Sequence, residues 1–356
     1  MDDIKKLREK IDTLDNKIIN LIKERALTAL KVGEIKKLHN IPLYVPEREQ
    51  EIYERIKATD CTPISSESLI NIFREIISAC RSLEEKLKIA YLGPMGTFTH
   101  LAATKYFGLS EELVALTSIS EVFEEVDKGR ANFGVIPIEN SLEGVVNYAI
   151  DMFLESNLKI CGELYTPVSH NLMNKSGLIE DVKKVFSHPH AIAQCKNFIG
   201  NKLAHISIVE VESTAKAAEI ASKDTGASAI ASEVAASLYG LKIIYKGIED
   251  ELNNFTRFLV IAKDSNFKGN NAKTSLMFSV PHKAGSLYEA LEVFAKNCIN
   301  MTKIESRPSK KKAWDYVFFV DIDGHIDNEK IKKAINEFSK RVAFLKILGS
   351  YRKGEI

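Results

Sequence analysis

The sequence contains few cysteines and no long apolar run. Its five cysteines are scattered along the chain without close pairs, which argues against a disulfide framework or a zinc site and favours a reducing compartment. No segment approaches the length of a membrane span, and the charged first residues lack the apolar core of a signal peptide. We therefore expect a soluble, cytoplasmic protein.

Net charge is also nearly absent. The formal charge of +1 gives no support for a nucleic-acid-binding surface or a disordered acidic tail. Hydrophobic residues make up 45% of the chain, which is ordinary for a globular protein. A chain of 356 residues exceeds what one hydrophobic core usually holds, so two or three domains are expected.

The first segment, residues 1–87, has the periodicity of long helices. Apolar residues recur every three or four positions and predict one helix over residues 3–39; they include Leu7, Ile11, Leu14, Ile18 and Leu21. Such a helix would be roughly 50 Å long, too long for one small domain to cover, so a partner chain is expected. A short helix over 47–57 and a third over 66–87 complete an all-α domain and suggest an intertwined dimer.

Polar residues interrupt the apolar rows of this domain. Arg25 stands at a heptad position where leucine is expected, and Lys36 lies on nearly the same face three turns later. Glu84 falls in the apolar row of the third helix. Each of them alone could be a snorkelling side chain or half of a structural ion pair. Together, inward-facing cations with a carboxylate suggest a pocket for a small dianion.

Five motifs in this segment resemble the all-helical chorismate mutases. They are Leu7-Arg8-Glu9-Lys10-Ile11-Asp12, Glu24-Arg25, Val32-Gly33-Glu34-Ile35-Lys36, Pro46-Glu47-Arg48-Glu49 and Ile72 to Arg81. By resemblance, Arg25 and Arg8 of the partner subunit hold the substrate carboxylates, while Lys36 contacts the ether oxygen. Glu49 takes the ring hydroxyl, with Arg48 beside it. The implied reaction, chorismate to prephenate, needs orientation and charge stabilisation but no nucleophile.

Two positions depart from the family pattern. Glu84 stands where many members have a glutamine that donates a hydrogen bond to the ether oxygen, and a carboxylate cannot donate unless it is protonated. Mutase activity is therefore expected to fall as the pH rises. Val45 replaces an aspartate of some members, so that substrate contact is expected to be absent.

Residues 88–265 alternate strand and helix patterns, which predicts an α/β domain. Polar residues gather where buried strands lead into helices, and ligands of open α/β sheets bind there, beside helix N-termini. They include Thr97, Glu139, Asn140, Ser187, Ser213 and Thr214. The commonest role of Ser, Thr and Asn at such places is helix capping. Two similar lobes with a cleft between them are the expected architecture.

Five motifs of this domain together resemble the prephenate dehydratases. They are Gly93-Pro94-Met95-Gly96-Thr97-Phe98-Thr99, Pro137-Ile138-Glu139-Asn140-Ser141, Ser187-His188-Pro189 with Gln194, Ser213-Thr214, and Asn253-Asn254-Phe255-Thr256-Arg257-Phe258. The first is not a Walker loop, because the Gly-Lys-Ser/Thr ending is missing. The resemblance implies a fold like that of the two-lobed periplasmic binding proteins. It also implies loss of water and carbon dioxide from prephenate to give phenylpyruvate, without metal or cofactor.

The ring hydroxyl of prephenate is a poor leaving group and must be protonated as its C–O bond breaks. By resemblance, Thr256 is the leading candidate to hydrogen-bond that hydroxyl. Further catalytic candidates are Glu139, Asn140, Ser187 and Gln194, and the expected substrate-binding residues are Thr97, Ser213, Thr214, Asn254 and Arg257. Alternation along a strand points Arg257 away from Thr256, so a structural ion pair is an equal alternative for Arg257. The pair His188 and His190 suggests a helix start, since no complete set of metal ligands accompanies it.

Residues 273–356 follow a polar linker and show a βαββαβ order, the ferredoxin-like arrangement. Strands are expected at 274–280, 300–306, 314–322 and 342–351. The basic turn at 309–312 is interpreted as a solvated hairpin tip. The segment resembles an ACT domain, in which Gly285-Ser286-Leu287 and Glu305-Ser306-Arg307-Pro308 match the motifs that bind phenylalanine. Feedback inhibition at a dimer interface is the implied role, and dimerisation alone is the alternative.

The three resemblances together imply a bifunctional enzyme of phenylalanine synthesis. Its partners would be chorismate and prephenate as substrates, L-phenylalanine as effector, and further copies of the chain in a homodimer or higher homo-oligomer. Two alternatives remain open. One is a dehydratase that prefers arogenate, which a competition assay between the two substrates distinguishes. The other is a non-catalytic amino-acid sensor, because a two-lobed fold with an amino-acid module also suits that role.

Overall fold

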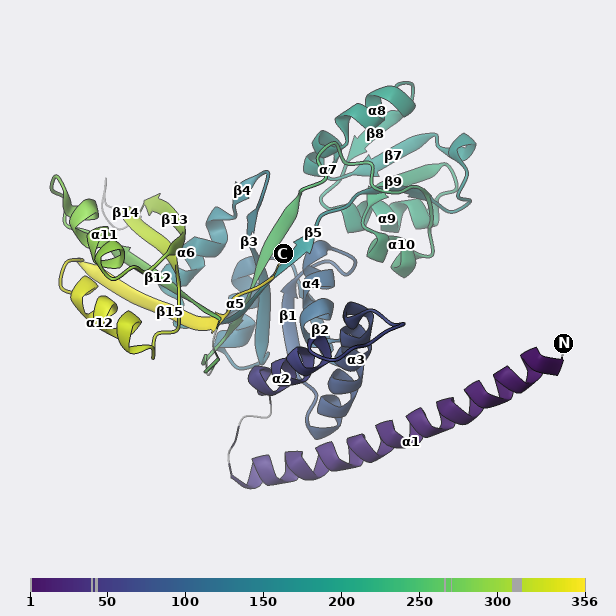
Figure 1. Ribbon diagram of the computed structural model, residues 1–356. Coiled ribbons are helices and arrows are strands. Elements are labelled where there is room, and N and C mark those ends of the chain that lie inside the picture. Colours follow the sequence, from purple (N-terminus) through teal and green to yellow (C-terminus); the bar gives the residue numbers. More distant parts are fainter. Residues whose placement is uncertain are drawn as a thin grey trace. The chain divides into compact units, whose positions relative to one another are not determined.

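The computed structural model describes residues 2–39, 41, 44–265, 267–269, 271–308 and 316–355 and is shown in Figure 1. The chain divides into two compact units. One comprises residues 1–88 and 107–112, and the other comprises residues 89–106 and 113–356. The short segment 107–112 thus belongs to the first unit, although its neighbours in the sequence belong to the second.

The first unit is helical, as predicted. Its helices are α1 (Asp2–Leu38), α2 (Pro46–Lys57) and α3 (Ser66–Glu84). α3 begins where the Ser65 hydroxyl accepts a hydrogen bond from the Ser68 backbone N–H at 3.1 Å, a helix cap. The buried core is small and includes Ile52, Ile56 and Ile77. Most of the apolar row of α1 is exposed in a single chain; the exposed fraction of Leu7, for example, is 62%. In the single chain, this helix therefore lacks the packing of its apolar face that would stabilise it.

The second unit begins with a lobe built on a mixed sheet. Its strand order is β2-β1-β3-β11-β5, with β4 paired to β3. β1 runs parallel to β3, whereas β11 runs antiparallel to both β3 and β5. The strands are β1 (Lys88–Leu92), β2 (Glu112–Leu116), β3 (Phe133–Asn140), β4 (Gly144–Val145), β5 (Lys159–Pro167) and β11 (Phe255–Ala262), and the helices are α4 (Phe98–Phe107), α5 (Ile119–Asp127) and α6 (Asn147–Glu155).

The other lobe lies between β5 and β11 in the sequence and has the sheet order β10-β6-β9-β7-β8. Its strands are β6 (Asn171–Asn174), β7 (Lys184–Ser187), β8 (Ser207–Glu210), β9 (Ala227–Ala231) and β10 (Lys242–Tyr245), and its helices are η1 (Ile179–Asp181), α7 (Pro189–Gln194), α8 (Lys196–Lys202), α9 (Thr214–Lys223) and α10 (Glu233–Tyr239). The chain therefore crosses between lobes twice, after β5 and before β11. The expected two-lobed α/β architecture is confirmed.

The C-terminal part has the expected βαββαβ order. Its elements are β12 (Ala272–Ser279), α11 (Ser286–Lys296), β13 (Met301–Pro308), β14 (Tyr316–Asp323), α12 (Glu329–Phe338) and β15 (Phe344–Arg352), with sheet order β13-β14-β12-β15. Aromatic side chains fill the space between helices and sheet, including Phe278, Phe294 and Phe338, whose rings pack at 4.7–4.9 Å. The predicted basic turn at 309–312 and the first two residues of the strand predicted at 314–322 lie outside the described residues.

Candidate active sites

The three helices of the first unit enclose a cavity of about 610 Å³. Its lining includes every polar residue that the sequence placed there from a single chain, namely Arg25, Lys36, Arg48, Glu49 and Glu84. Arg8 is exposed on α1 and is not among the described residues that line the cavity. The sequence expectation that Arg8 acts from a partner subunit therefore stays a prediction.

One wall of the cavity pairs Lys36 with Glu84. The Lys36 Nζ lies 3.4 Å from Glu84 Oε2, and both side chains are largely buried. The approach is close because position 33 is a glycine: a Cβ at Gly33 would lie 2.8 Å from the Glu84 side chain. A cation and a carboxyl group therefore meet at one point of the cavity lining, where each affects a polar ligand atom.

Elsewhere in the cavity lining, Arg81 holds Glu49 in place. Arg81 is buried and donates to Glu49, to Glu111 Oε1 at 2.7 Å and to the Phe107 carbonyl at 2.6 Å. Burial raises the pKa of the Glu49 carboxyl, although Arg81 opposes the shift. No role was predicted for Arg81 or Glu111. Glu111 could not be linked to this site from the sequence, because it lies in the short segment 107–112, outside the three helices of this unit.

In the second unit, β3 and β11 bring together residues more than a hundred positions apart. Thr256 is the register partner of Asn140 on one side and of Thr166 on the other. The Asn140 Nδ2 donates to Thr256 Oγ1 at 2.9 Å and to Asn254 Oδ1 at 2.8 Å. Gln194, from α7 of the other lobe, accepts from Asn254 Nδ2 at 3.2 Å. We call these four residues, Asn140, Gln194, Asn254 and Thr256, the Thr256 cluster.

The orientation of the Asn140 amide is fixed by the backbone. Its Oδ1 accepts from the N–H groups of Leu142 and Glu143 at 3.0 and 3.1 Å, so Nδ2 must face Thr256. The Thr256 oxygen is therefore an acceptor in this contact. Its own hydroxyl hydrogen remains available for a ligand.

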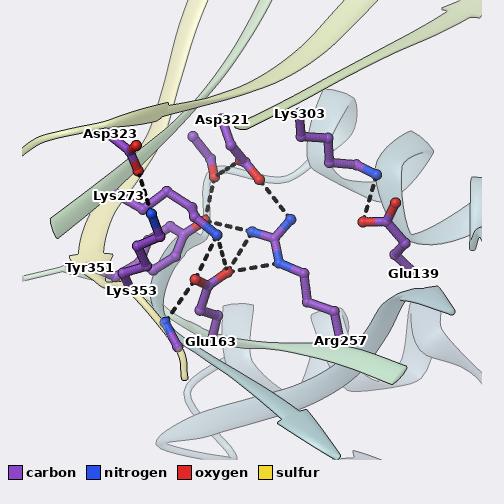
Figure 2. A network of polar contacts seen from close by, with 11 residues as sticks. Glu139, Glu163, Arg257, Lys273, Lys303, Asp321, Asp323, Tyr351 and Lys353 are labelled. Carbon is purple, nitrogen blue, oxygen red and sulfur yellow. Dashed lines mark hydrogen bonds and ion pairs between the residues drawn. The ribbon is translucent and has the colours of Figure 1, made fainter. Parts of the chain in front are cut away.

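Arg257 and Glu139 are register partners next to the pair of Thr256 and Asn140, so strand alternation places them on the opposite face. Figure 2 shows both side chains. Arg257 is 4% exposed and donates to Glu163 at 2.7 Å, Asp321 at 2.6 Å and the Tyr351 hydroxyl at 3.1 Å. Burial by itself lowers the pKa of Arg257, but these carboxylates outweigh it and hold that pKa well above its ordinary value. Of the two roles open to Arg257, the geometry matches the structural ion pair.

Glu139, expected among the catalytic residues, is also turned away from Thr256. Its Oε2 pairs with the Nζ of Lys303 from β13 at 2.8 Å, as seen on the right of Figure 2. The alternation of side chains along β3 explains this, because Asn140 occupies the other face. Any effect of Glu139 on the Thr256 cluster must therefore pass through the strand.

Several other predicted residues make local backbone contacts. Ser213 caps α9 by accepting from the Lys216 N–H at 3.0 Å, Thr97 donates to the Pro94 carbonyl at 2.9 Å, and the buried Ser187 donates to the Ile230 carbonyl at 2.7 Å. Thr214 is buried in the first turn of α9. None of these contacts joins the Thr256 cluster, and capping, the commonest role of such residues, accounts for Ser213.

The two histidines at the start of α7 have structural contacts. His188 accepts from the His190 N–H at 3.3 Å, and His190 pairs with Glu143 of the first lobe at 2.5 Å. Within the described ranges, no group of three or more His, Cys, Asp or Glu side chains is arranged to hold a metal ion. The same ranges contain no helix that is long and apolar enough to cross a membrane.

The C-terminal part carries a second cavity, of about 590 Å³, at the start of α11. Gly285, Ser286 and Leu287 line it together with Tyr316 and Phe318 of β14. Gly285 adopts φ +85°, which favours glycine. The Ser286 hydroxyl is buried and has no hydrogen-bond partner among the described residues.

The second predicted effector motif runs along β13, beside this cavity. Ser306 and Pro308 are the register partners of Phe318 and Tyr316. Glu305 lies on the other face of β13, together with Lys303 and Arg307. Arg307 lies 3.4 Å from Asp151 of α6, so this face of β13 contacts the first lobe.

Comparison with known proteins assigns all three regions. Residues 7–85 match the family described as chorismate mutase type II, residues 89–266 match prephenate dehydratase, and residues 274–339 match the ACT domain. The structure resembles the prephenate dehydratase of Arthrobacter aurescens in complex with L-Phe (TM-score 0.70, 29% identity, 75% of this chain and 90% of that one). It also resembles the prephenate dehydratase of Staphylococcus aureus (TM-score 0.66, 33% identity, 75% and 100%).

Relatives with similarity over the whole chain carry one description. The bifunctional chorismate mutase/prephenate dehydratase of Aquifex aeolicus is 52% identical over 99% of both chains. The protein with the same description from Escherichia coli is 31% identical over 97% of this chain and 95% of its own. These matches extend from the helical unit through the ACT domain, so the chain belongs to the bifunctional chorismate mutase/prephenate dehydratase family.

Proposed function

We propose that the helical cavity binds chorismate as an extended dianion. Arg25 and Arg8 of the partner subunit hold the two carboxylates. Lys36 and Glu84 face the ether oxygen, where negative charge grows as the C–O bond breaks. Glu49 receives the ring hydroxyl with Arg48 beside it, and Arg81 keeps the Glu49 carboxyl in position. The contact between Lys36 and Glu84 in the cavity lining carries this assignment, because it places the cation and the carboxyl group at a single point.

Mixing two inactive variants tests whether Arg8 acts across a dimer. Arg8→Ala and Arg25→Ala are each expected to abolish most mutase activity. In a heterodimer of the two, one site has both arginines and the other has neither. Random assortment of equal amounts should therefore restore about a quarter of the wild-type chorismate-consumption rate. The two variants incubated separately are the controls, and no recovery on mixing would show that Arg8 does not act from a partner.

The pH dependence of the mutase tests the role of Glu84. A donor role requires a protonated carboxyl group, so the parent rate should fall as the pH rises. Glu84→Gln should flatten this profile, since an amide donates at every pH. The matched control is Glu85→Gln, at the exposed neighbouring position. Chorismate consumption measured from mildly acidic to mildly alkaline pH decides the matter, and identical profiles for Glu84→Gln and the parent contradict the role.

For the dehydratase, we propose that the Thr256 hydroxyl donates a hydrogen bond to the departing ring hydroxyl of prephenate. As that C–O bond breaks, the hydroxyl takes up a proton and leaves as water, while the ring carboxylate leaves as carbon dioxide and its electron pair completes the aromatic ring. A threonine is a weak acid, so Thr256 positions and polarises the leaving group rather than ionising. Asn140 supports this role by occupying the Thr256 oxygen as a donor. Asn254 and Gln194 complete a polar surface drawn from both lobes.

We further propose that the cavity at the start of α11 binds L-phenylalanine and that binding inhibits the dehydratase. Backbone N–H groups at the helix start suit a carboxylate. Tyr316 and Phe318 offer an apolar wall for the ring. β13 connects this cavity to the first lobe. One face of β13 lies beside β14, which lines the cavity, and its other face contacts Glu139 and Asp151. Inhibition then reflects different phenylalanine affinities of two states.

Ser286→Ala tests this site directly. The Ser286 hydroxyl is buried without a partner in the described structure, so its removal should leave the melting temperature unchanged or slightly raised. Phenylalanine should nevertheless bind about tenfold more weakly, because one buried hydrogen bond to the ligand is lost. Calorimetric titration and dehydratase inhibition at millimolar phenylalanine measure both effects. An unchanged affinity, or a parent enzyme that millimolar phenylalanine neither binds nor inhibits, contradicts the proposal.

A further inference from the structure

His170 lies at one end of the hydrogen-bond chain that runs through the Thr256 cluster. It lies on the crossover between β5 and β6 and is 2% exposed. Its backbone N–H donates to Glu249 Oε2 at 2.8 Å, which fixes the main chain. Its ring Nε2 lies 2.8 Å from Gln194 Oε1, whereas its Nδ1 has no hydrogen-bond partner among the described residues.

The donor and acceptor roles along this chain follow from its fixed ends. Asn140 Oδ1 accepts from two backbone N–H groups, so its Nδ2 donates to Asn254 Oδ1. Asn254 must then donate through Nδ2 to Gln194 Oε1. At the far end, Gln194 Nε2 donates to the Glu143 carboxylate at 2.8 Å. Reversing the Gln194 amide would place donor against donor at Asn254.

Gln194 Oε1 is therefore an acceptor for both Asn254 and His170. The His170 ring must carry its proton on Nε2 to make this contact. Burial lowers the pKa of His170, with Gln194, Glu249 and Glu143 opposing the shift, so the ring is neutral near physiological pH. The unpartnered Nδ1 agrees with this tautomer, because it needs no acceptor.

We propose that His170 is a positioning residue of the dehydratase, whose Nε2–H fixes the Gln194 amide and thereby holds Asn254 and Asn140 in the arrangement that leaves the Thr256 hydroxyl hydrogen free. Without His170, Gln194 Oε1 keeps only the 3.2 Å contact from Asn254. The amide can then rotate, and the bridge from the second lobe to the Thr256 cluster loosens. Because Gln194 comes from α7 and Thr256 from β11, His170 couples the placement of both lobes. The inference rests on the proposed role of the Thr256 cluster.

A matched pair of variants isolates the hydrogen bond from packing. His170→Gln keeps a side-chain N–H donor, and His170→Met has a similar length without one. His170→Met should lower the dehydratase kcat at least about tenfold, since small displacements of positioned groups are costly. His170→Gln should recover most of this loss. The prephenate KM should change little in either, and chorismate mutase activity of the same chain is the internal control.

Parental kcat in His170→Met, or equal losses in the two variants, overturns the proposal. If His170→Met does not fold, the tautomer in the wild-type chain decides. Nitrogen-15 NMR of labelled histidines, assigned by the signal missing in His170→Gln, should show a neutral ring protonated on Nε2. A ring protonated on Nδ1, or a charged ring at neutral pH, contradicts it. An active Thr256→Ala variant refutes the site itself, whereas an inactive Thr256→Ala with an active His170→Met refutes only this inference.

Discussion

Thr256→Ala should lower the kcat for phenylpyruvate formation by on the order of 10²–10³-fold, the usual cost of removing one hydrogen-bond donor from developing charge. The structure explains the size of the effect. Asn140 already satisfies the Thr256 oxygen as a donor at 2.9 Å, so the hydroxyl hydrogen has no competing role there. Conversion of prephenate by the purified full-length chain gives the measurement. The rate from chorismate to prephenate should stay at the parental value.

Two further replacements separate chemistry from packing at this position. Thr256→Val keeps the branched shape but lacks the hydroxyl, so it should be as impaired as Thr256→Ala. Thr256→Ser keeps the hydroxyl and should retain much more activity, with some loss because serine populates more rotamers. If Thr256→Val makes phenylpyruvate at the parental rate, Thr256 does not face the leaving hydroxyl.

The sequence predicted the parts of the fold that depend on local patterns. The long apolar row of α1, the strand–helix alternation and the βαββαβ order each follow from side-chain period. The cavity residues Arg25 and Lys36 could be identified for a related reason. A charged residue inside an apolar helical row costs free energy unless it is paired, so its presence there indicates a specific role. Strand alternation also predicted that Arg257 points away from Thr256, and the register of β3 and β11 bears this out.

Contacts between distant segments could not be read from the sequence. Glu111 pairs with Arg81 only because residues 107–112 join the helical unit. His170 meets Gln194 only because the crossover after β5 and the end of α7 converge. Strand period shows that Arg257 points away from Thr256, but the identity of its partner Asp321, like that of the Glu139 partner Lys303, depends on how the ACT sheet contacts the first lobe. The spacing of residues along the chain does not show how the ACT sheet and the first lobe pack together.

Arg257→Met should destabilise the second unit by about 3–5 kcal/mol, the typical cost of removing one partner from a buried ion pair. Figure 2 shows the reason. Arg257 joins Glu163 and Asp321, both fully buried, across the contact between the dehydratase lobe and the ACT domain. Lys273 also pairs with Glu163 at 2.7 Å. Two cations and two carboxylates thus balance, and loss of Arg257 leaves one negative charge unpaired.

The identity of the unpaired charge predicts which second change restores stability. After Arg257→Met, Glu163 keeps Lys273, whereas the partners that Asp321 keeps among the described residues are neutral, such as the Ser275 hydroxyl at 2.5 Å. Adding Asp321→Leu removes that uncompensated charge. The double variant should therefore unfold at a higher denaturant concentration than Arg257→Met alone, because an apolar pair of similar volume can replace a buried ion pair.

Equilibrium unfolding of the full chain, followed by the loss of dehydratase activity and by calorimetry, measures both variants. The matched control is Arg130→Met, which removes a cation from an exposed pair with Glu125 and should leave stability unchanged. A fully additive loss in the double variant would mean that Asp321 and Arg257 are not energetically coupled. Restored stability together with weakened phenylalanine inhibition would have another meaning. It would show that the buried charges of Arg257 and Asp321 serve to transmit the effect of phenylalanine from the ACT domain to β11, rather than to stabilise the fold.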